Sequence, residues 1–244
     1  MPEPRSELLV LAGVHTRIGR YHILQGVDLA VARGELTMLL GRNGAGKTTT
    51  LRTIMGLWRA CAGSIRFDGT EIAGRDTPDV ARLGIAYVPE SMGIFAGLTV
   101  RENLLLAARS GPPSDERLER VFRFFPPLKT FWHLPAGLLS GGQKQMLAIA
   151  RAIVEPRKLI LVDEPTKGLA PAIINNLIEA FLELKKTDTT ILMVEQNFHA
   201  ARMLGDRVAV MDSGRIVHAG RMAELAADEA LQVKLLGLSL ESRP

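Results

Sequence analysis

Cysteine is almost missing from this chain of 244 residues, in which Cys61 is the single example. One thiol can form neither an intramolecular disulfide nor a cysteine-rich zinc site, and this usage is typical of a reducing, cytoplasmic compartment. Long apolar runs are missing too, since no segment approaches the roughly 18–20 apolar residues that span a bilayer. The first residues carry acids at Glu3 and Glu7 and no long apolar core, so we expect no secretory signal.

A strong charge of one sign is also absent. The chain has 30 Lys and Arg against 26 Asp and Glu, a formal net charge of +4. The basic residues are interleaved with acids, which is typical of a solvated surface and predicts no nucleic-acid partner. Apolar residues at 47% and charged residues at 23% are ordinary globular values. The length fits one α/β domain, or one core with a smaller lobe, at roughly 100–200 residues per domain.

Short β-rich runs alternate with helical patterns along most of the chain, and this alternation predicts an α/β fold. From residue 91 to about 135, Leu, Arg and Glu recur at helical spacing, broken by proline pairs, so we expect an inserted helical lobe. The first two strands are able to pair antiparallel. The predicted strands are residues 8–14, 26–31, 35–40, 64–67, 85–88, 158–163, 190–194, 207–212 and 215–219, and the predicted helices are 48–57, 100–109, 115–124, 144–154, 171–186 and 198–204.

A glycine-rich motif, GRNGAGKTT, lies between an apolar strand and a helical segment, and it satisfies the phosphate-loop pattern G-x-x-x-x-G-K-[ST] in full. Its glycines let successive N–H groups and the positive end of the following helix receive phosphate oxygens. We expect Lys47 to bridge the β- and γ-phosphates, the Thr48 hydroxyl to ligate Mg²⁺, and Thr49 to reach the α-phosphate. The nucleotide-binding residues predicted from this motif are Gly41, Arg42, Asn43, Gly44, Ala45, Gly46, Lys47, Thr48 and Thr49.

A pair of acids, Asp163 and Glu164, ends the apolar run KLILV. An Asp-Glu pair alone often does no more than begin a turn, but beside a phosphate loop it acquires a chemical role. Asp163, at the carboxyl end of the strand, is placed to hold Mg²⁺ through water, and Glu164 to polarise the attacking water as the general base. The two motifs together predict nucleotide hydrolysis.

A third motif, LLSGGQKQ, opens the helical pattern that precedes these acids. Ser140 suits a plain helix N-cap, and the helix amino terminus offers N–H donors to an anion. Asp163 follows Gly142 by 21 positions, which leaves room for a helix and a turn. With this motif, formed by Ser140, Gly141, Gly142 and Gln143, the chain resembles the ATPase subunits of ATP-binding cassette (ABC) transporters, and the resemblance runs from about Leu8 to Gly237.

The resemblance implies a P-loop NTPase core with an antiparallel β subdomain and an inserted helical subdomain. The core would cover about residues 1–90 and 156–244, and the helical subdomain about 91–155. It also implies a head-to-tail dimer with two ATP molecules between the subunits, where Ser140, Gly142 and Gln143 complete the site of the opposite subunit. The expected partners are a second cassette, either different from this chain or identical to it, two transmembrane permease subunits, and indirectly a substrate-binding protein. Such a chain lies on the inner face of the cell membrane.

Four positions depart from the common pattern of this family. Where an aromatic ring usually stacks on adenine, the chain has Ile18, which offers only an apolar face, so Tyr21 or His22 is an alternative contact. The usual Gln after the strand 85–88 is Glu90, whose carboxylate could still ligate Mg²⁺ or contact the membrane partner while adding negative charge near the phosphates.

The other two departures follow the acid pair. The usual Asp is Ala170, which weakens communication across the dimer, and the switch His after the strand 190–194 is Gln196. We assign Gln196 to the catalytic set with Glu164 and Lys47. His199 lies one turn further along, and we interpret it as a surface helix residue.

As a set, YVPE, EPTKGLAP and VEQN resemble the second ATPase of importers for branched-chain and related amino acids. The alternatives are an importer of urea or short amides, and a nucleotide-gated regulatory cassette with little turnover. The retained Lys47, Glu164 and complete SGGQ favour an enzyme. A cassette of DNA repair or translation is disfavoured, because such proteins carry long insertions or two cassettes in one chain.

Aromatic side chains cluster in residues 122–135, which hold five Phe and Trp among prolines. We interpret this segment as a small core of the helical lobe, with Trp132 as the more plausible surface contact. Trp58, at the end of the first helix, is expected in the core.

Overall fold

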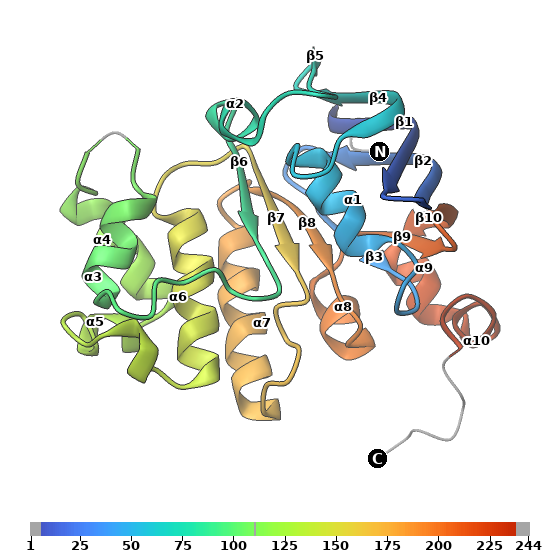
Figure 1. The fold of residues 1–244 in the computed structure, drawn as a ribbon. Coiled ribbons are helices and arrows are strands. Elements are labelled where there is room, and N and C mark those ends of the chain that lie inside the picture. Colours follow the sequence, from blue (N-terminus) through green and yellow to red (C-terminus); the bar gives the residue numbers. More distant parts are fainter. Residues whose placement is uncertain (1–5, 110, 238–244) are drawn as a thin grey trace.

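The computed structural model describes residues 6–109 and 111–237. Two sheets are packed together, and a group of helices lies beyond one end of the larger sheet (Figure 1). No helix in these residues is long and apolar enough to cross a membrane.

The larger sheet has six strands in the order β10-β9-β3-β8-β7-β6. Five are parallel and β10 is antiparallel to its neighbour β9. Every residue of β3, β7 and β8 is buried, as expected for parallel strands covered on both faces. Because parallel strands end at one edge of the sheet, the segments after β3, β6, β7 and β8 meet there. The bounds are β3 Leu36–Leu40, β6 Ile85–Val88, β7 Leu159–Asp163, β8 Thr190–Val194, β9 Arg207–Asp212 and β10 Arg215–Arg221.

The smaller sheet is antiparallel, in the order β2-β1-β4-β5. Its first two strands pair as the sequence allowed, from Glu7 opposite Ala32 to Ile18 opposite Tyr21 at the hairpin end. Both strands are longer than predicted. The bounds are β1 Glu7–Ile18, β2 Tyr21–Ala32, β4 Ala60–Phe67 and β5 Thr70–Glu71.

Helices cover both faces of the larger sheet and form the lobe (Figure 1). In the lobe, α3 begins with a capping box between Thr99 and Glu102, and the Ser114 side chain caps α4, so local polar residues fix both starts. The helices of the lobe are α3 Val100–Ala107, α4 Asp115–Phe124, α5 Pro127–Thr130, the short 3-10 helix Ala136–Leu138, and α6 Gly141–Ile153. The others are α1 Lys47–Ile54, α2 Thr77–Arg82, α7 Pro171–Lys185, α8 Phe198–Leu204, α9 Met222–Ala227 and α10 Glu229–Leu236.

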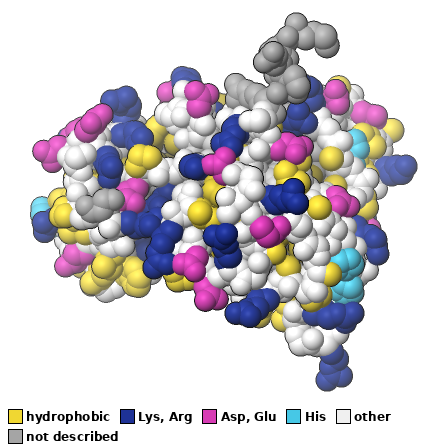
Figure 2. All heavy atoms as spheres, turned by 90° about the horizontal axis from the view of Figure 1, so that it is seen from above, with side chains coloured by type: hydrophobic (Ala, Val, Ile, Leu, Met, Phe, Trp, Pro, Cys, Tyr) yellow, Lys and Arg dark blue, Asp and Glu magenta, His cyan; other side chains and the backbone are white. Residues whose placement is uncertain are grey.

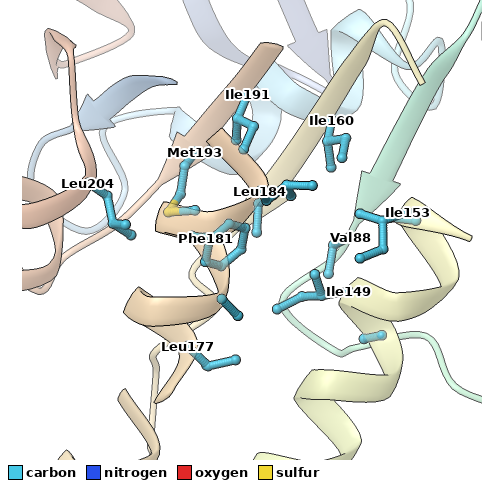
Figure 3. Packing of buried hydrophobic residues seen from close by; sticks show 14 of the residues in the cluster. Val88, Ile149, Ile153, Ile160, Leu177, Phe181, Leu184, Ile191, Met193 and Leu204 are labelled. Atoms are coloured by element: carbon cyan, nitrogen blue, oxygen red, sulfur yellow. The ribbon is translucent and has the colours of Figure 1, made fainter. Parts of the chain in front are cut away.

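Two apolar cores lie on opposite faces of the larger sheet, since successive side chains of a strand point to opposite sides. On β8, Ile191 and Met193 belong to the core shared with the lobe, whereas Leu192 belongs to the core under the antiparallel sheet. Figure 3 shows the first core, where Ile149 and Ile153 of α6 and Leu177, Phe181 and Leu184 of α7 lie beside Ile160, Ile191 and Met193 of the sheet. The lobe is thus packed against the same strands whose carboxyl ends meet at one edge of the sheet.

The prediction for Trp58 was wrong, because its side chain is 36% exposed. The helix α1 ends at Ile54, earlier than expected, and Gly56 follows with φ 73°. A Cβ at Gly56 would lie 2.4 Å from the Arg75 carbonyl oxygen, so the chain turns there as only glycine allows. Residues 122–135 do form a local core: Phe125 and Leu128 are buried, and the partly buried Trp132 packs edge-on against Phe122.

Candidate active site

The glycine-rich loop joins β3 to α1, as its position in the sequence predicted. Gly41 has φ 139°, and a Cβ there would lie 2.1 Å from the Met211 carbonyl oxygen, so the close approach to β9 requires glycine. The side chain of Lys47 is folded back over the loop, and its Nζ donates to the carbonyl oxygens of Gly41 at 2.8 Å and Arg42 at 3.1 Å. No side chain caps α1, whose N-cap is Gly46, so the N–H groups of its first turn are available to an anion.

Asp163 is fully buried at the end of β7 and joins the loop to the sheet. Its Oδ1 accepts a hydrogen bond from Thr48 Oγ1 at 3.0 Å, and its Oδ2 accepts one from the Tyr87 hydroxyl at 3.1 Å. Burial raises the pKa of Asp163, and the two hydrogen bonds oppose that rise. Burial, reinforced by the Asp163 charge, also raises the pKa of Tyr87 to about 12. Tyr87 was not singled out in the sequence, although it stands in the quoted motif YVPE.

Glu164 follows Asp163 with a left-handed backbone, at φ 48°, and its N–H donates to the Val194 carbonyl at 2.9 Å. Its two carboxylate oxygens differ in their surroundings. Oε1 accepts a hydrogen bond from Gln196 Nε2. Oε2 is buried and accepts no hydrogen bond from the described residues, and Lys167 Nζ lies 3.3 Å away as an ion-pair partner. Gln196 therefore lies beside Glu164, in contact with its carboxylate.

Glu90 lies at the end of the neighbouring strand β6 and is held by Lys167, whose Nζ donates to Glu90 Oε1 at 2.6 Å. Nearby, a cavity of about 190 Å³ is lined by the loop residues Gly41, Arg42 and Asn43 and by Gln196. The structure therefore gathers the loop, the acid pair, Glu90 and Gln196 at the carboxyl edge of the sheet.

Glu195 is a second residue that the sequence reasoning passed over. It is 2% exposed, and its carboxylate accepts hydrogen bonds from Thr166 N at 3.1 Å, Thr166 Oγ1 at 3.0 Å, Gln196 N at 3.0 Å and Asn197 N at 3.1 Å. Burial raises its pKa, which these hydrogen bonds partly offset. Glu195 ties the segment after the acid pair to the segment that carries Gln196. The motif VEQN could have indicated this role of Glu195, because an acid directly after a buried strand needs hydrogen-bond donors from neighbouring segments.

The SGGQ motif begins α6 at the end of the lobe. Ser140 Oγ accepts from Gln143 N at 3.3 Å, and Gln143 Oε1 accepts from Ser140 N at 2.9 Å, so the expected N-cap is part of a complete capping box. A Cβ at Gly142 would lie 2.5 Å from Ile173 Cγ2, so glycine is needed for α6 to approach α7. These contacts define the geometry of the motif, with Gly141 exposed at the start of the helix.

The remaining departures from the family pattern lie outside this cluster of contacts. Ile18 is half-buried at the end of β1, opposite Tyr21, which is 67% exposed across the hairpin. His22 stacks on His15 with ring centroids 5.1 Å apart. Ala170 is the exposed N-cap residue of α7, and His199 is exposed on α8, as expected of a surface helix residue.

Comparison with known proteins decides the family. The family model described as ABC transporter matches residues 24–167. The chain belongs to the ABC transporter family. It is 40% identical over 226 residues to BraG of Pseudomonas aeruginosa, a high-affinity branched-chain amino acid transport ATP-binding protein, with 92% of this chain and 97% of BraG covered. It is 36% identical to LivF of Archaeoglobus fulgidus, a probable branched-chain amino acid transport ATP-binding protein, with 89% and 93% covered.

Solved structures agree with this ABC assignment. The ADP conformation of MJ1267, an ATP-binding cassette of an ABC transporter, superimposes with a TM-score of 0.80 at 28% identity and covers 94% of this chain and 98% of that one. The dimeric cassette MJ0796 gives a TM-score of 0.77 at 25% identity, with 88% and 98% covered. The α/β P-loop architecture with its antiparallel sheet and helices is thus that of an ABC cassette, and the chain is an ABC-type ATPase.

Proposed function

We propose that this ATPase powers the import of branched-chain or related amino acids. The observation that carries the proposal is the 40% identity to BraG, which spans nearly the whole of both chains. The cassette itself does not need to touch the transported solute, so the substrate class rests on this likeness and not on the geometry of the site.

In the proposed reaction the glycine-rich loop holds the phosphates. Residues 41–46 present backbone N–H groups, Lys47 reaches the β- and γ-phosphates, and Thr49 reaches the α-phosphate. Lys47 is 5% exposed, and burial lowers its pKa while Glu164 and Asp163 act in the opposite direction. Its Nζ donates to two carbonyl oxygens and forms no ion pair among the described residues, so a nucleotide phosphate would give this almost buried ammonium a direct anionic partner.

Mg²⁺ suits the donors next to this loop. Thr48 Oγ1 and the Asp163 carboxylate are hard oxygen ligands already 3.0 Å apart, the chemistry that Mg²⁺ prefers. The Glu90 carboxylate is engaged by Lys167, so the proposed Mg²⁺ ligands are Thr48 and Asp163 without Glu90. When bound, Mg²⁺ would neutralise charge that develops on the phosphates.

Glu164 acts as the general base in this proposal. Its buried Oε2 is ion-paired with Lys167 Nζ at 3.3 Å and accepts no hydrogen bond from the described residues, so in this proposal Oε2 is the oxygen that takes the proton of the attacking water. Gln196 Nε2 holds the other oxygen and thereby fixes the orientation of the carboxylate. The capping box uses the N–H groups of Ser140 and Gln143, so the donors to the ATP of an opposite subunit would be the Ser140 hydroxyl, the N–H groups of Gly141 and Gly142, and the side-chain amide of Gln143.

The likeness to a solved cassette dimer supports the assembly that we infer. Two cassettes pair head to tail, and this chain pairs either with a different cassette or with a second copy of itself. The lobe, about residues 91–155, contacts the two transmembrane permease subunits, and the α/β core covers about residues 1–90 and 156–244. A substrate-binding protein acts indirectly, and the chain lies at the inner face of the membrane.

Uptake tests the proposed substrate class. Cells that lack this chain should lose uptake of radiolabelled leucine, the wild-type gene should restore it, and Lys47→Ala should not. Lys186→Met is the matched control, because Lys186 forms an exposed ion pair with Glu183 at the end of α7, outside the lobe, and this variant should restore uptake. Unchanged leucine uptake in cells that lose urea or short-amide uptake would contradict the proposal.

A further inference from the structure

Lys167 bridges two carboxylates that come from different strand ends. Its Nζ lies 2.6 Å from Glu90 Oε1, after β6, and 3.3 Å from Glu164 Oε2, after β7. The strands β6 and β7 are paired in parallel, so the two acids leave the same edge of the sheet side by side. The carboxylates of Glu90 and Glu164 raise the pKa of Lys167, which is the effect expected when acids surround an ammonium.

Lys167 offsets part of the negative charge at this edge. Carboxylates of Asp163, Glu164, Glu90 and Glu195 gather there, and the ammonium groups of Lys47 and Lys167 oppose them. Both Glu164 and Glu90 contribute to the raised pKa of Asp163, so the acids act on one another electrostatically. Without Lys167 the Glu90 carboxylate would lose its ion pair, and its charge would face the anionic phosphates of the nucleotide.

The contact with Glu164 has a separate, geometric consequence. Gln196 holds Oε1, whereas Lys167 is the described group that pairs with the buried Oε2. The Glu164 side chain is 8% exposed and the Lys167 side chain is 57% exposed, so the lysine reaches the base from the solvent side. The neighbouring Thr166 is fixed to Glu195 through both its N–H and its hydroxyl, which holds the start of this segment in place.

We propose that Lys167 is a positioning residue of the ATPase site, which orients the Glu164 carboxylate and neutralises Glu90 beside the nucleotide phosphates. The proposal rests on the proposed role of Glu164 as the general base. It separates two effects: the charge of Lys167 acts on nucleotide affinity through Glu90, and its contact with Oε2 acts on turnover through Glu164.

A charge cycle tests the first effect without any turnover. The dissociation constant of the slowly hydrolysed analogue MgATPγS is measured by calorimetry for the wild type, Lys167→Met, Lys167→Arg and the double variant Glu90→Gln/Lys167→Met. Lys167→Met should weaken binding roughly two- to five-fold, the size expected for a partly exposed ion pair. Lys167→Arg should bind as the wild type does, and the double variant should recover wild-type affinity.

Lys129→Met is the matched control for this binding measurement, since it also removes an exposed lysine from an ion pair, with Glu119. Affinity in Lys167→Met equal to that in Lys129→Met would overturn the charge effect. Affinity in the double variant below that of Lys167→Met would overturn it as well, because Glu90 would then be a ligand of the metal–nucleotide complex and not an uncompensated charge.

Steady-state kinetics with MgATP test the second effect. Lys167→Met should lower kcat about tenfold or more, as expected when a catalytic group loses its orientation. The double variant should keep this low kcat although its affinity recovers, and Lys167→Arg should keep most of the wild-type kcat. A wild-type kcat in Lys167→Met would overturn the positioning role. Equal turnover in the wild type and in Glu164→Gln would instead show that the proposed role of Glu164 is wrong. The affinity measurements do not depend on that role, so the two failures can be told apart.

Discussion

Thr48 Oγ1 and Asp163 Oδ1 are joined by a hydrogen bond of 3.0 Å, although 115 positions separate them in the chain. The bond connects the first turn of α1 with the end of β7, two strands away from β3 in the sheet. It brings a hydroxyl and a carboxylate, the two hard oxygen donors of the site, to one point beside the phosphate loop.

Removing the Thr48 hydroxyl should therefore weaken the response to Mg²⁺. In Thr48→Ala the Mg²⁺ concentration that gives half-maximal ATPase activity should rise about tenfold or more, because a metal ligand and a partner of Asp163 are lost together. Titration of activity with Mg²⁺ at fixed ATP measures this shift. Thr48→Ser keeps the hydroxyl and is the control, and equal titration curves for Thr48→Ala and Thr48→Ser would contradict the assigned role.

Glu164→Gln should slow hydrolysis by roughly 10²–10⁴-fold, the usual contribution of a general base. The amide keeps the shape of the side chain but cannot accept the proton of water, so ATP binding should persist and ATP should hold the subunits in a closed dimer. Phosphate release and gel filtration with ATP measure the two effects. Glu183→Gln, an exposed acid on α7, should behave as the wild type. Glu164 has another role if its variant hydrolyses ATP as fast as the unmodified chain.

Gln196→His should raise the turnover of the isolated chain roughly tenfold, since an imidazole can donate to the γ-phosphate where charge develops. Gln196 already contacts Glu164, so the new ring would stand beside the proposed general base. Steady-state Mg-ATPase assays with Glu164→Gln as the blank provide the measurement. His199→Gln, on the exposed face of α8, should leave the rate unchanged. An unaltered rate in Gln196→His would remove this explanation for the missing His.

Asp68 should make the stability of the fold depend on acid pH. Hydrogen bonds from Lys158, at 2.6 Å, and from Arg33 lower its pKa below the ordinary value of 3.8. The unfolded chain then binds this proton more readily, so the contribution of Asp68 is present above about pH 3.8 and is lost as pH falls through the lower native pKa. The contribution is at most about 1 kcal/mol, because all three side chains are partly exposed.

Asp68→Asn removes the charge of Asp68 without straining the backbone, since asparagine tolerates the left-handed conformation at φ 51°. Its free energy of unfolding should be below that of the wild type at pH 7, and the difference should shrink toward pH 2–3. Denaturant unfolding across this range measures the difference, with Asp79→Asn as a control for an exposed ion pair within one helix. A difference that stays constant with pH would show that the lowered pKa is not its source.

Local patterns in the sequence were enough for most of the elements. Short continuous apolar runs predicted the strands of the larger sheet nearly to the residue. A parallel strand that is covered on both faces buries consecutive apolar side chains, so its length can be read from the run. The end of α1 was predicted too late, because the helical pattern continues past Gly56, whose left-handed backbone at φ 73° ends the helix while Leu57 N donates back to the Arg52 carbonyl at 2.9 Å. For the same reason Trp58 was placed wrongly in the core.

The sequence by itself determined the chemistry of the site, because the phosphate loop, the acid pair and the SGGQ cap are contiguous motifs whose backbone geometry is local. The tertiary structure decided which of their neighbours meet. The strand order β3-β8-β7-β6 places Gln196 and Glu90 on either side of Glu164, and no spacing along the chain encodes that order. Lys167 and Glu195 gain their partners only through this adjacency, because parallel strands from distant segments end at the same edge of the sheet.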